Sequence, residues 1–434
     1  MPLDDFASPG VSLNSGTGSL QEALFRTRET SRWIAEPLSD EEQIVQAMED
    51  ASPTKWHLAH TTWFFEEMVL KPHDPAYREF DERFNFCFNS YYENAGPRHP
   101  RPKRSLLTRP ANSEVKAYRD HVDRSLADFL ARGNGPSPEV LNLIELGIHH
   151  EQQHQELMFT DILAAFAGNP LRPVYREAAD SGPAQADQAG QEWISFPGGI
   201  FPVGHDGEGF AYDNEGPRHE QLLRPFRLSN RLVTNGEWLE FMADGGYTTP
   251  TLWLSDGWAR VQAEGWDAPL YWEQRDGAWR QMSLQGLKPV DPARPVCHVS
   301  YYEADAFARW ADKRLPTEFE WEVASASVPL EGNMLGQKAL HPHPVTNGAG
   351  ALQQMIGELW EWTGSAYLPY PGFKAAEGAI GEYNGKFMCN QFVLKGGSCV
   401  TPEGHIRRSY RNFFYPHQRW QFNGLRLADD GGAA

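Results

Sequence analysis

The stretch LNLIELGIHHEQQHQELMFTDIL, residues 141–163, is a long helix candidate in a chain of 434 residues. Residues 137–139, Ser-Pro-Glu, precede it with a start signal. Serine can cap the first turn, proline suits the first helical position, and the acidic residue lies near the positive end of the helix dipole. His150 and His154 are four residues apart, so the stretch predicts a helix with two imidazoles stacked on one face.

Two imidazoles one turn apart can bind one divalent ion without moving the backbone. The same face carries Asp161 and also Gly147, which leaves room for something bulky. A third ligand can come from residues 56–70, WHLAHTTWFFEEMVL, because adjacent bundle helices build metal sites from facing side chains. His60 is the candidate there and His57 is its competitor. Taken singly, each histidine could instead be satisfied in the core or at the surface, so the residues alone leave this alternative open.

Residues 150–154, HEQQH, also fit the HExxH pattern, in which two histidines hold zinc and the glutamate is the general base of a metalloprotease. In such enzymes a third ligand normally follows downstream at a defined spacing. The next histidine here is His205, beyond a predicted linker. Glu151 can equally be an exposed residue or a partner of a ligand. A zinc hydrolase therefore stays an alternative.

Composition limits the classes of function. The chain has 39 Lys and Arg against 58 Asp and Glu, and a net charge of −19 repels nucleic acid and anionic lipid, so small molecules or proteins are the expected partners. No signal peptide and no apolar run of ~18–20 residues is present, which predicts a soluble cytoplasmic protein without a membrane partner. Four scattered cysteines are expected to be free thiols, which suits a reducing compartment: Cys87, Cys297, Cys389 and Cys399.

The change in composition and pattern along the chain predicts two domains, and so does its length. Residues 1–19 are expected to be a flexible N-terminus and residues 20–175 a helical bundle, in which residues 39–42, Ser-Asp-Glu-Glu, form a capping box. Residues 176–192 have the composition of a linker. Residues 193–430 are rich in Gly, Pro and Trp and are expected to form a loop-rich domain. Its only helix candidates are brief and lie near residues 233–241 and 302–310.

The ordered motifs of the whole chain resemble those of the ergothioneine-biosynthesis sulfoxide synthases of EgtB type. The first half contributes WHLAH, NSYYENAGPRHPRPKR and HEQQHQELM. The second half contributes FPGGIFPVG, NEGPRHEQLL, VTNGEWLEFM, VCHVSYYEADAFARWADKRLPTEFEWEVA, LWEWTGSAYLPYPGF, VLKGGSC and FNGLRLA. The resemblance implies an α+β multidomain fold. A DinB-like four-helix bundle precedes a domain of the formylglycine-generating-enzyme (FGE-sulfatase) type, a C-type-lectin-like fold with little regular secondary structure.

By position, the resemblance implies that His60, His150 and His154 hold Fe(II), and that His57 does not. It further implies an oxygenase that uses O2 to join a thiol, cysteine or gamma-glutamylcysteine, to C2 of the imidazole of hercynine. The product is a sulfoxide. Related enzymes attack C5 of histidine instead, so the choice of carbon also rests on the resemblance. Unlike a site with a carboxylate ligand, three neutral imidazoles contribute no negative charge, and an incoming thiolate supplies it.

The tandem tyrosines Tyr91 and Tyr92 match a pair found near the iron in one branch of the family. Their implied role is to deliver a proton or hydrogen atom, with Tyr91 first and Tyr92 in support. A phenol of pKa about 10 stays protonated at pH 7, as such a donor requires. Core aromatics with a hydrogen-bonded tip are the alternative.

The resemblance also places the substrate contacts. By position, the residues that bind the trimethylammonium group of hercynine are Asn412, Phe413 and Phe414, and Gln153 also contacts this substrate. Aromatic faces suit a cation that cannot donate a hydrogen bond, although the phenylalanines could be ordinary core. Arg98 and Arg101 match arginines that bind the thiol's carboxylate, and a solvated basic turn is the alternative. Family members that use gamma-glutamylcysteine carry an acidic residue at position 414 and an arginine at position 418, where this chain has Phe and Gln, which favours cysteine.

Three other functions compete with this one. A copper-dependent formylglycine-generating oxidase is disfavoured because its two copper cysteines would fall at Thr401 and Ile406. A DinB-type metal-dependent thiol transferase would act without O2. A scaffold with a structural ion would fill its coordination shell with protein ligands, and three are evident.

Overall fold

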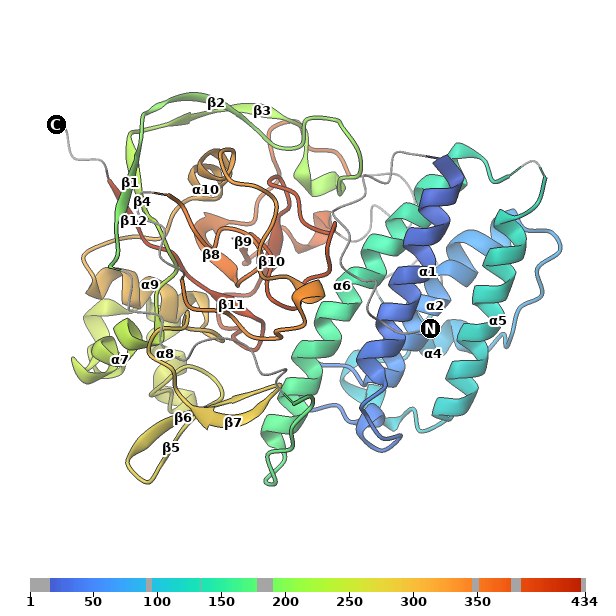
Figure 1. Ribbon diagram of the computed structural model, residues 1–434, viewed down its shortest axis with the longest axis horizontal. Helices are drawn as coiled ribbons and strands as arrows, with labels where there is room; N and C mark the ends of the chain where they lie inside the picture. Colours follow the sequence, from blue (N-terminus) through green and yellow to red (C-terminus); the bar gives the residue numbers. More distant parts are fainter. Residues whose placement is uncertain are drawn as a thin grey trace. The chain divides into compact units, whose positions relative to one another are not determined.

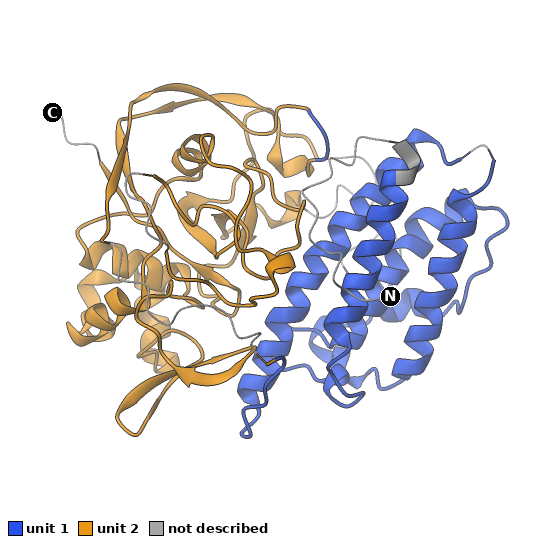
Figure 2. Cartoon of the chain, viewed as in Figure 1, with its two compact units in different colours: residues 1–176, 208–210, 376–383 blue, residues 177–207, 211–375, 384–434 orange. Residues whose placement is uncertain are grey.

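A computed structural model describes residues 16–90, 96–133, 135–177, 190–345, 351–375 and 384–430. The chain divides into two compact units (Figure 2). The first contains residues up to Arg176 together with Glu208–Phe210, and the second contains most of the residues from Glu177 onward. Most of the predicted linker lies outside the described residues.

The first unit is a bundle of four long helices (Figure 1). Helix α6 packs against α1 and α2, and α2 also packs against α5. All residues of α2 are buried, which places this helix inside the unit. The long helices are α1 (Gly16–Ala35), α2 (Thr54–Phe65), α5 (Asn112–Leu130) and α6 (Pro138–Gly168). The short elements are η2 (Glu42–Ile44), the π-helical η3 (Glu66–Leu70), α3 (Lys71–His73), α4 (Phe84–Phe88) and η5 (Arg101–Leu106).

The predicted start of α6 is confirmed. The Ser137 side chain accepts a hydrogen bond from the Val140 amide, and Pro138 is the first helical residue. Helix α1, in contrast, begins at Gly16, inside the segment predicted to be flexible. The first turn of a helix is stabilised by any good capping residue, but continuation needs an apolar face to bury.

The same need for an apolar face explains why no α-helix follows the capping box at residues 39–42. Ser39 and Glu42 do exchange their predicted hydrogen bonds, at 2.8 and 3.2 Å. Only the 3-10 turn Glu42–Ile44 follows, and the chain becomes extended at Val45, whose side chain is 45% exposed. The capping box is therefore present, but a short turn follows it and not an α-helix.

The second unit consists of short strands and helices joined by long loops (Figure 1). Its sheets have the strand orders β1-β4-β12, β10-β9-β8-β11, β2-β3 and β5-β6-β7. Strand β9 pairs antiparallel with both β8 and β10, whereas β11 pairs parallel with β8. The strands are β1 (Trp193–Phe196), β2 (Gly199–Val203), β3 (His219–Leu223), β4 (Phe226–Ser229), β5 (Trp272–Arg275), β6 (Ala278–Ser283), β7 (Gly286–Pro289), β8 (Trp360–Ala366), β9 (Phe392–Lys395), β10 (Asn412–Phe414), β11 (Asn423–Gly424) and β12 (Ala428–Asp430).

The predicted helices of this unit are present as α7 (Asn235–Ala243) and α9 (Tyr301–Trp310). Helices α8 (Ser255–Glu264) and α10 (Glu318–Ser325) were missed. The signal for α10 was in the sequence, because Thr317 and Glu320 form a capping box directly before its apolar residues.

Buried aromatics and buried ion pairs hold the loops of the second unit together. Four tryptophans with at most 1% exposure lie in its core: Trp238, Trp321, Trp360 and Trp362. Four ion pairs join segments that are far apart in sequence: Arg407–Glu215, Arg411–Glu318, Arg419–Glu303 and Arg426–Glu361. The four cysteines are free, as predicted. Among the described residues, no helix is long and apolar enough to cross a membrane.

Candidate metal centre

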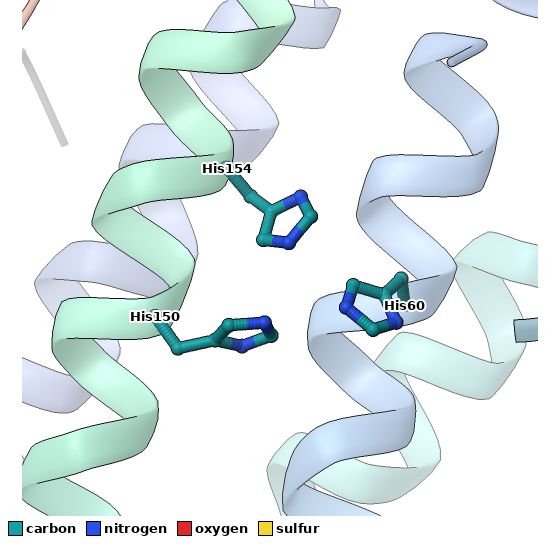
Figure 3. A group of neighbouring side chains, drawn as sticks. All are labelled: His60, His150 and His154. Carbon is teal, nitrogen blue, oxygen red and sulfur yellow. The ribbon is translucent and has the colours of Figure 1, made fainter. Parts of the chain in front are cut away.

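Three histidine side chains of the first unit converge between two neighbouring helices (Figure 3). His60 comes from α2, and His150 and His154 come from α6. One ring nitrogen of each lies within 4.8 Å of one from both others. His57, the competitor on α2, is not a member of this group. The helical spacing of the pair on α6 and the packing of α2 against α6 therefore bring together the three histidines that the sequence singled out.

The ring of His60 is held in one orientation by its own helix and by a carbonyl at the end of α4. Trp56 and Trp63 stack on it at centroid distances of 4.5 and 5.4 Å, each inclined by 14°. Its Nδ1 lies 2.6 Å from the carbonyl oxygen of Phe88. Because a carbonyl can only accept, Nδ1 carries the proton and Nε2 keeps the lone pair. His60 thus offers Nε2 as a ligand atom.

The other two imidazoles differ from His60 in their surroundings. The Nδ1 atom of His154 lies 2.8 Å from Nδ1 of His57, which leaves Nε2 of His154 as its ligand atom. The Nδ1 atom of His150 is buried and has no hydrogen-bond partner within the described part of the chain. A buried ring nitrogen without a partner costs free energy, so it needs an explanation, and a bound ion supplies one.

Gly147 makes room for aromatic rings rather than for a ligand. A Cβ atom on this residue would lie 2.5 Å from the Phe65 ring and 3.0 Å from the Phe64 ring. Phe64 in turn packs on the His150 ring at 4.7 Å. The glycine therefore lets α2 approach α6 closely enough for the histidines to meet.

Electrostatics keeps the trio in the form that binds metals. Burial lowers the pKa of His150 to about 4 and lowers the pKa values of His60 and His154 well below their usual range. The nearby imidazoles lower the pKa values of His60 and His154 further, since each disfavours a second charge. Three neutral imidazoles are a donor set that suits a divalent transition ion such as iron or zinc. The residues present therefore fit a metal ion.

Glu151 does not belong to the site. It is fully buried, and its carboxylate accepts hydrogen bonds from Arg28 at 2.8 Å, from Ser31 at 2.6 Å and from Arg119. The two guanidinium groups outweigh burial and lower the pKa of Glu151 to about 2. A carboxylate held in this way is occupied and too weak a base for the role that the HExxH pattern would give it, so the zinc-hydrolase alternative is disfavoured.

The remaining predicted site residues are distributed over both units. Gln153 is half-buried beside His154 on α6, and Arg101 donates a hydrogen bond to the Asp50 carbonyl. Arg98 is half-buried, and Tyr91 and Tyr92 lie outside the described residues.

In the second unit, Asn412, Phe413 and Phe414 form strand β10. Phe413 stacks on Tyr367 with ring centroids 4.1 Å apart, and the Asn412 side chain accepts a hydrogen bond from the Phe413 amide. The structure therefore brings the histidines together and leaves the substrate-contact assignments as predictions.

Sequence reasoning missed Arg104, although its motif had been singled out. The guanidinium is buried and lies over the Trp56 ring, 3.3 Å from its centroid. It donates hydrogen bonds to Ser52 at 2.8 Å and to Ser90 at 3.0 Å. Nothing in the local sequence distinguishes this arginine from the other basic residues of the motif, because its two partners lie 52 and 14 residues away along the chain.

Comparison with known proteins identifies both domains. A DinB superfamily model matches residues 23–158, and a model of the sulfatase-modifying factor enzyme 1-like domain matches residues 178–342 and 337–431. The formylglycine-generating enzyme of Thermomonospora curvata is 36% identical over 284 residues, which is 55% of this chain and 93% of that protein. The predicted fold class is thereby confirmed.

Two curated relatives match both domains at once. The hercynine oxygenase of Mycobacterium tuberculosis is 33% identical over 403 residues, covering 87% of this chain and 91% of the relative. That of Mycolicibacterium smegmatis is 34% identical over 413 residues, with the same coverage of 87% and 91%. The resemblance drawn from the motifs is confirmed, and the chain belongs to the hercynine oxygenase family.

Proposed function

We propose that this chain is an iron(II)- and O2-dependent sulfoxide synthase of ergothioneine biosynthesis. It joins the sulfur of cysteine, or of gamma-glutamylcysteine, to C2 of the imidazole of hercynine. The observation that carries the proposal is the convergence of three neutral imidazoles within 4.8 Å in a chain of the hercynine oxygenase family. Because both substrates are small and the chain is strongly anionic, no nucleic-acid partner is needed.

His60, His150 and His154 would hold the ion. Bound iron supplies redox chemistry with O2 and lowers the pKa of a thiol that coordinates it. The chain's own contribution is electrostatic. The imidazoles carry no charge. Glu151, the residue that follows His150, is negatively charged, but Arg28 and Arg119 neutralise its carboxylate. An anionic sulfur therefore meets no opposing carboxylate among these groups.

Tyr91 is the proposed proton donor and Tyr92 its support. The residue before them, Ser90, is buried and accepts a hydrogen bond from Arg104 at 3.0 Å. Arg104 also stacks on Trp56, the ring that flanks ligand His60. The entry of the chain into the tyrosine pair is thus tied to the metal centre, which supports the assignment.

The contacts to hercynine are proposed from the family resemblance. Phe413 and Phe414, with Asn412, would contact its trimethylammonium group, and Gln153 on α6 is the other assigned residue. An aromatic face attracts a quaternary ammonium ion, which has no N–H group to donate in a hydrogen bond. Phe414 is half-buried and retains partial exposure for such a contact.

Arg98 and Arg101 are the proposed partners of the thiol's carboxylate. An arginine fork suits a carboxylate geometrically. The buried Gln418 accepts a hydrogen bond from the Tyr415 amide at 3.1 Å, and it provides no positive charge for a second carboxylate. This favours cysteine over gamma-glutamylcysteine.

The deciding experiment starts from protein reconstituted anaerobically with Fe(II). Air, cysteine and hercynine are then added, and the adduct is examined by mass spectrometry while O2 consumption is recorded. We expect a sulfoxide adduct that needs all four components. An adduct formed without O2 would support a thiol transferase instead, and a strong preference for gamma-glutamylcysteine would overturn the choice of thiol.

A further inference from the structure

Helix α2 carries a second histidine, His57, that touches the trio without joining it. Its Nδ1 lies 2.8 Å from Nδ1 of His154, and its Nε2 lies 2.9 Å from Oδ2 of Asp161. The His57 side chain is 2% exposed and that of Asp161 is 8% exposed. A carboxylate, an imidazole and a candidate ligand therefore form one buried hydrogen-bonded chain.

The direction of this chain follows from what each group can donate. The carboxylate of Asp161 only accepts, and its Oδ2 also accepts from the Ser52 amide at 2.8 Å. Nε2 of His57 therefore carries a proton. If His57 is neutral, its Nδ1 is an acceptor, so Nδ1 of His154 must donate and Nε2 of His154 keeps its lone pair.

The opposite direction is incompatible with metal binding. If His57 donated through both nitrogens, Nδ1 of His154 would have to accept. Nε2 of His154 would then carry the proton and could not bind an ion. The acceptor character of His57 toward His154, set by Asp161, decides whether His154 is a ligand.

We infer that His57, oriented by Asp161, is a positioning residue that fixes the ligand tautomer and ring orientation of His154. This inference rests on the metal site of the proposed function, since it takes the three histidines as the ligands of one ion, and it does not depend on the oxygen chemistry. It adds a residue outside that site on which metal affinity depends. Partners of this kind typically change metal affinity by 10–100-fold when they are replaced.

The two supported ligands are held by different means. His60 is oriented by the Phe88 carbonyl, which can only accept. His57 can donate or accept at either nitrogen, so it needs Asp161 to select one state. Asp161 lies on the same helix as His154, two turns further on, whereas His57 lies on α2. The chain of hydrogen bonds therefore runs from α6 to α2 and back to α6, and it ties together the two helices that supply the ligands.

The test measures metal affinity rather than turnover. We would determine the dissociation constant for Co(II) by chelator competition and record the visible spectrum of the bound ion. His57→Phe removes the acceptor and should weaken binding about 10–100-fold. His57→Asn keeps an oxygen near the position of Nδ1 and should restore most of the affinity. Asp161→Asn, which no longer forces His57 to accept, should weaken binding as well.

The matched control is His121→Phe in helix α5. His121 is half-buried and donates to or accepts from no member of the trio, and its Nε2 contacts the Arg78 carbonyl at 2.8 Å. Its replacement should leave Co(II) affinity unchanged. Circular dichroism and thermal unfolding would establish that each variant is folded.

Two results would overturn the inference. One is an unchanged affinity and spectrum in His57→Phe, and the other is equal weakening in His57→Asn and His57→Phe. If His57→Phe does not fold, Asp161→Asn still tests the inference. Unchanged Co(II) affinity in Asp161→Asn would contradict a role of Asp161 in orienting His57. Tight Co(II) binding that depends on His57 without O2 chemistry in the iron form would reject the proposed function and retain the inference.

Discussion

The helical first unit and the loop-rich second unit each bury a carboxyl group, with opposite consequences. In the first, Glu151 is surrounded by Arg28 and Arg119, and its pKa falls to about 2. In the second, Glu358 accepts hydrogen bonds from two neutral donors, Asn333 and the His343 amide, each at 2.8 Å. Burial raises the pKa of Glu358 to about 7. The neighbours, not burial itself, decide whether a carboxyl group is a fixed charge or a titrating one.

The same contrast exists within the bundle, between the charged Glu151 and the neutral histidines of the metal centre. Helix α6 directs His150 and His154 toward α2, and it directs Glu151 toward the arginines of α1 and α5. Helix α6 thus carries a fixed charge together with two of the three uncharged donors. We expect the two to fail differently when they are altered.

The largest effect is expected from removing a ligand. His154→Ala should reduce metal affinity by more than about 100-fold, since replacement of even an indirect partner costs up to that much. Metal content and sulfoxide formation should fall together, while the unfolding temperature of the metal-free protein should change little. Normal metal content in this variant would show that the trio is not the site. Glu358→Gln, in the other unit, serves as the control for metal content.

The second effect concerns stability without chemistry. Glu151→Gln leaves two buried guanidinium groups undercompensated and should lower the free energy of unfolding by roughly 3–5 kcal/mol. The folded-state pKa of Glu151 is about 2 against 4.5 for the free group, so its stabilisation is complete above pH 4.5 and is lost as the pH falls toward 2. Denaturant unfolding between pH 3 and 7 would measure both.

The exposed Glu22→Gln on α1 is the matched control for that experiment and should behave like the parent. A loss below about 1 kcal/mol in Glu151→Gln would mean that the ion pairs contribute no more than a typical surface pair. Glu151 would then not be a strongly stabilising fixed charge, and it would not differ from Glu358 in the way described.

Glu358 should give the opposite pH dependence. Its folded-state pKa is about 7 against 4.5 for the free group, so its contribution is complete below pH 4.5 and is lost as the pH rises through 7. Relative to the parent, Glu358→Gln should therefore become more stable between pH 4.5 and 8, by about 3 kcal/mol for a shift of this size. A stability difference that does not change with pH would contradict the assignment.

The smallest effect tests whether the second unit takes part in the reaction. Phe414→Leu should raise KM for hercynine by about two- to thirtyfold, which corresponds to the ~0.5–2 kcal/mol of a cation–π contact. Steady-state kinetics with histidine, which lacks the three methyl groups, is the internal control and should change less. Equal effects on both substrates would indicate lost packing rather than lost recognition.

How much the sequence predicts differs between the units for a physical reason. On α6, the ligand spacing and the helix start follow from local rules, and both are present around His150, His154 and Pro138. The contacts of His57 with His154 and Asp161 depend on how far α2 is displaced along α6. No local pattern encodes that displacement, so the sequence could name His57 only as a competitor.

The second unit was harder to predict because its order comes from distant pairs. Arg426 and Glu361 are buried together although 65 residues separate them, and strand β11 is only two residues long. Short strands carry too little periodicity to be recognised, and ion pairs between loops have no spacing rule. The motif resemblance supplied the fold there, whereas residue patterns supplied only α7 and α9.

The surroundings of Glu151 also matter for classifying genomes. A pattern search for HExxH would group this chain with metallopeptidases, since five letters cannot tell a base from a structural anion. Arg28 and Arg119 lie 123 and 32 residues away along the chain, yet they settle the question. A filter that rejects an HExxH glutamate paired with two buried arginines would keep this chain out of peptidase inventories.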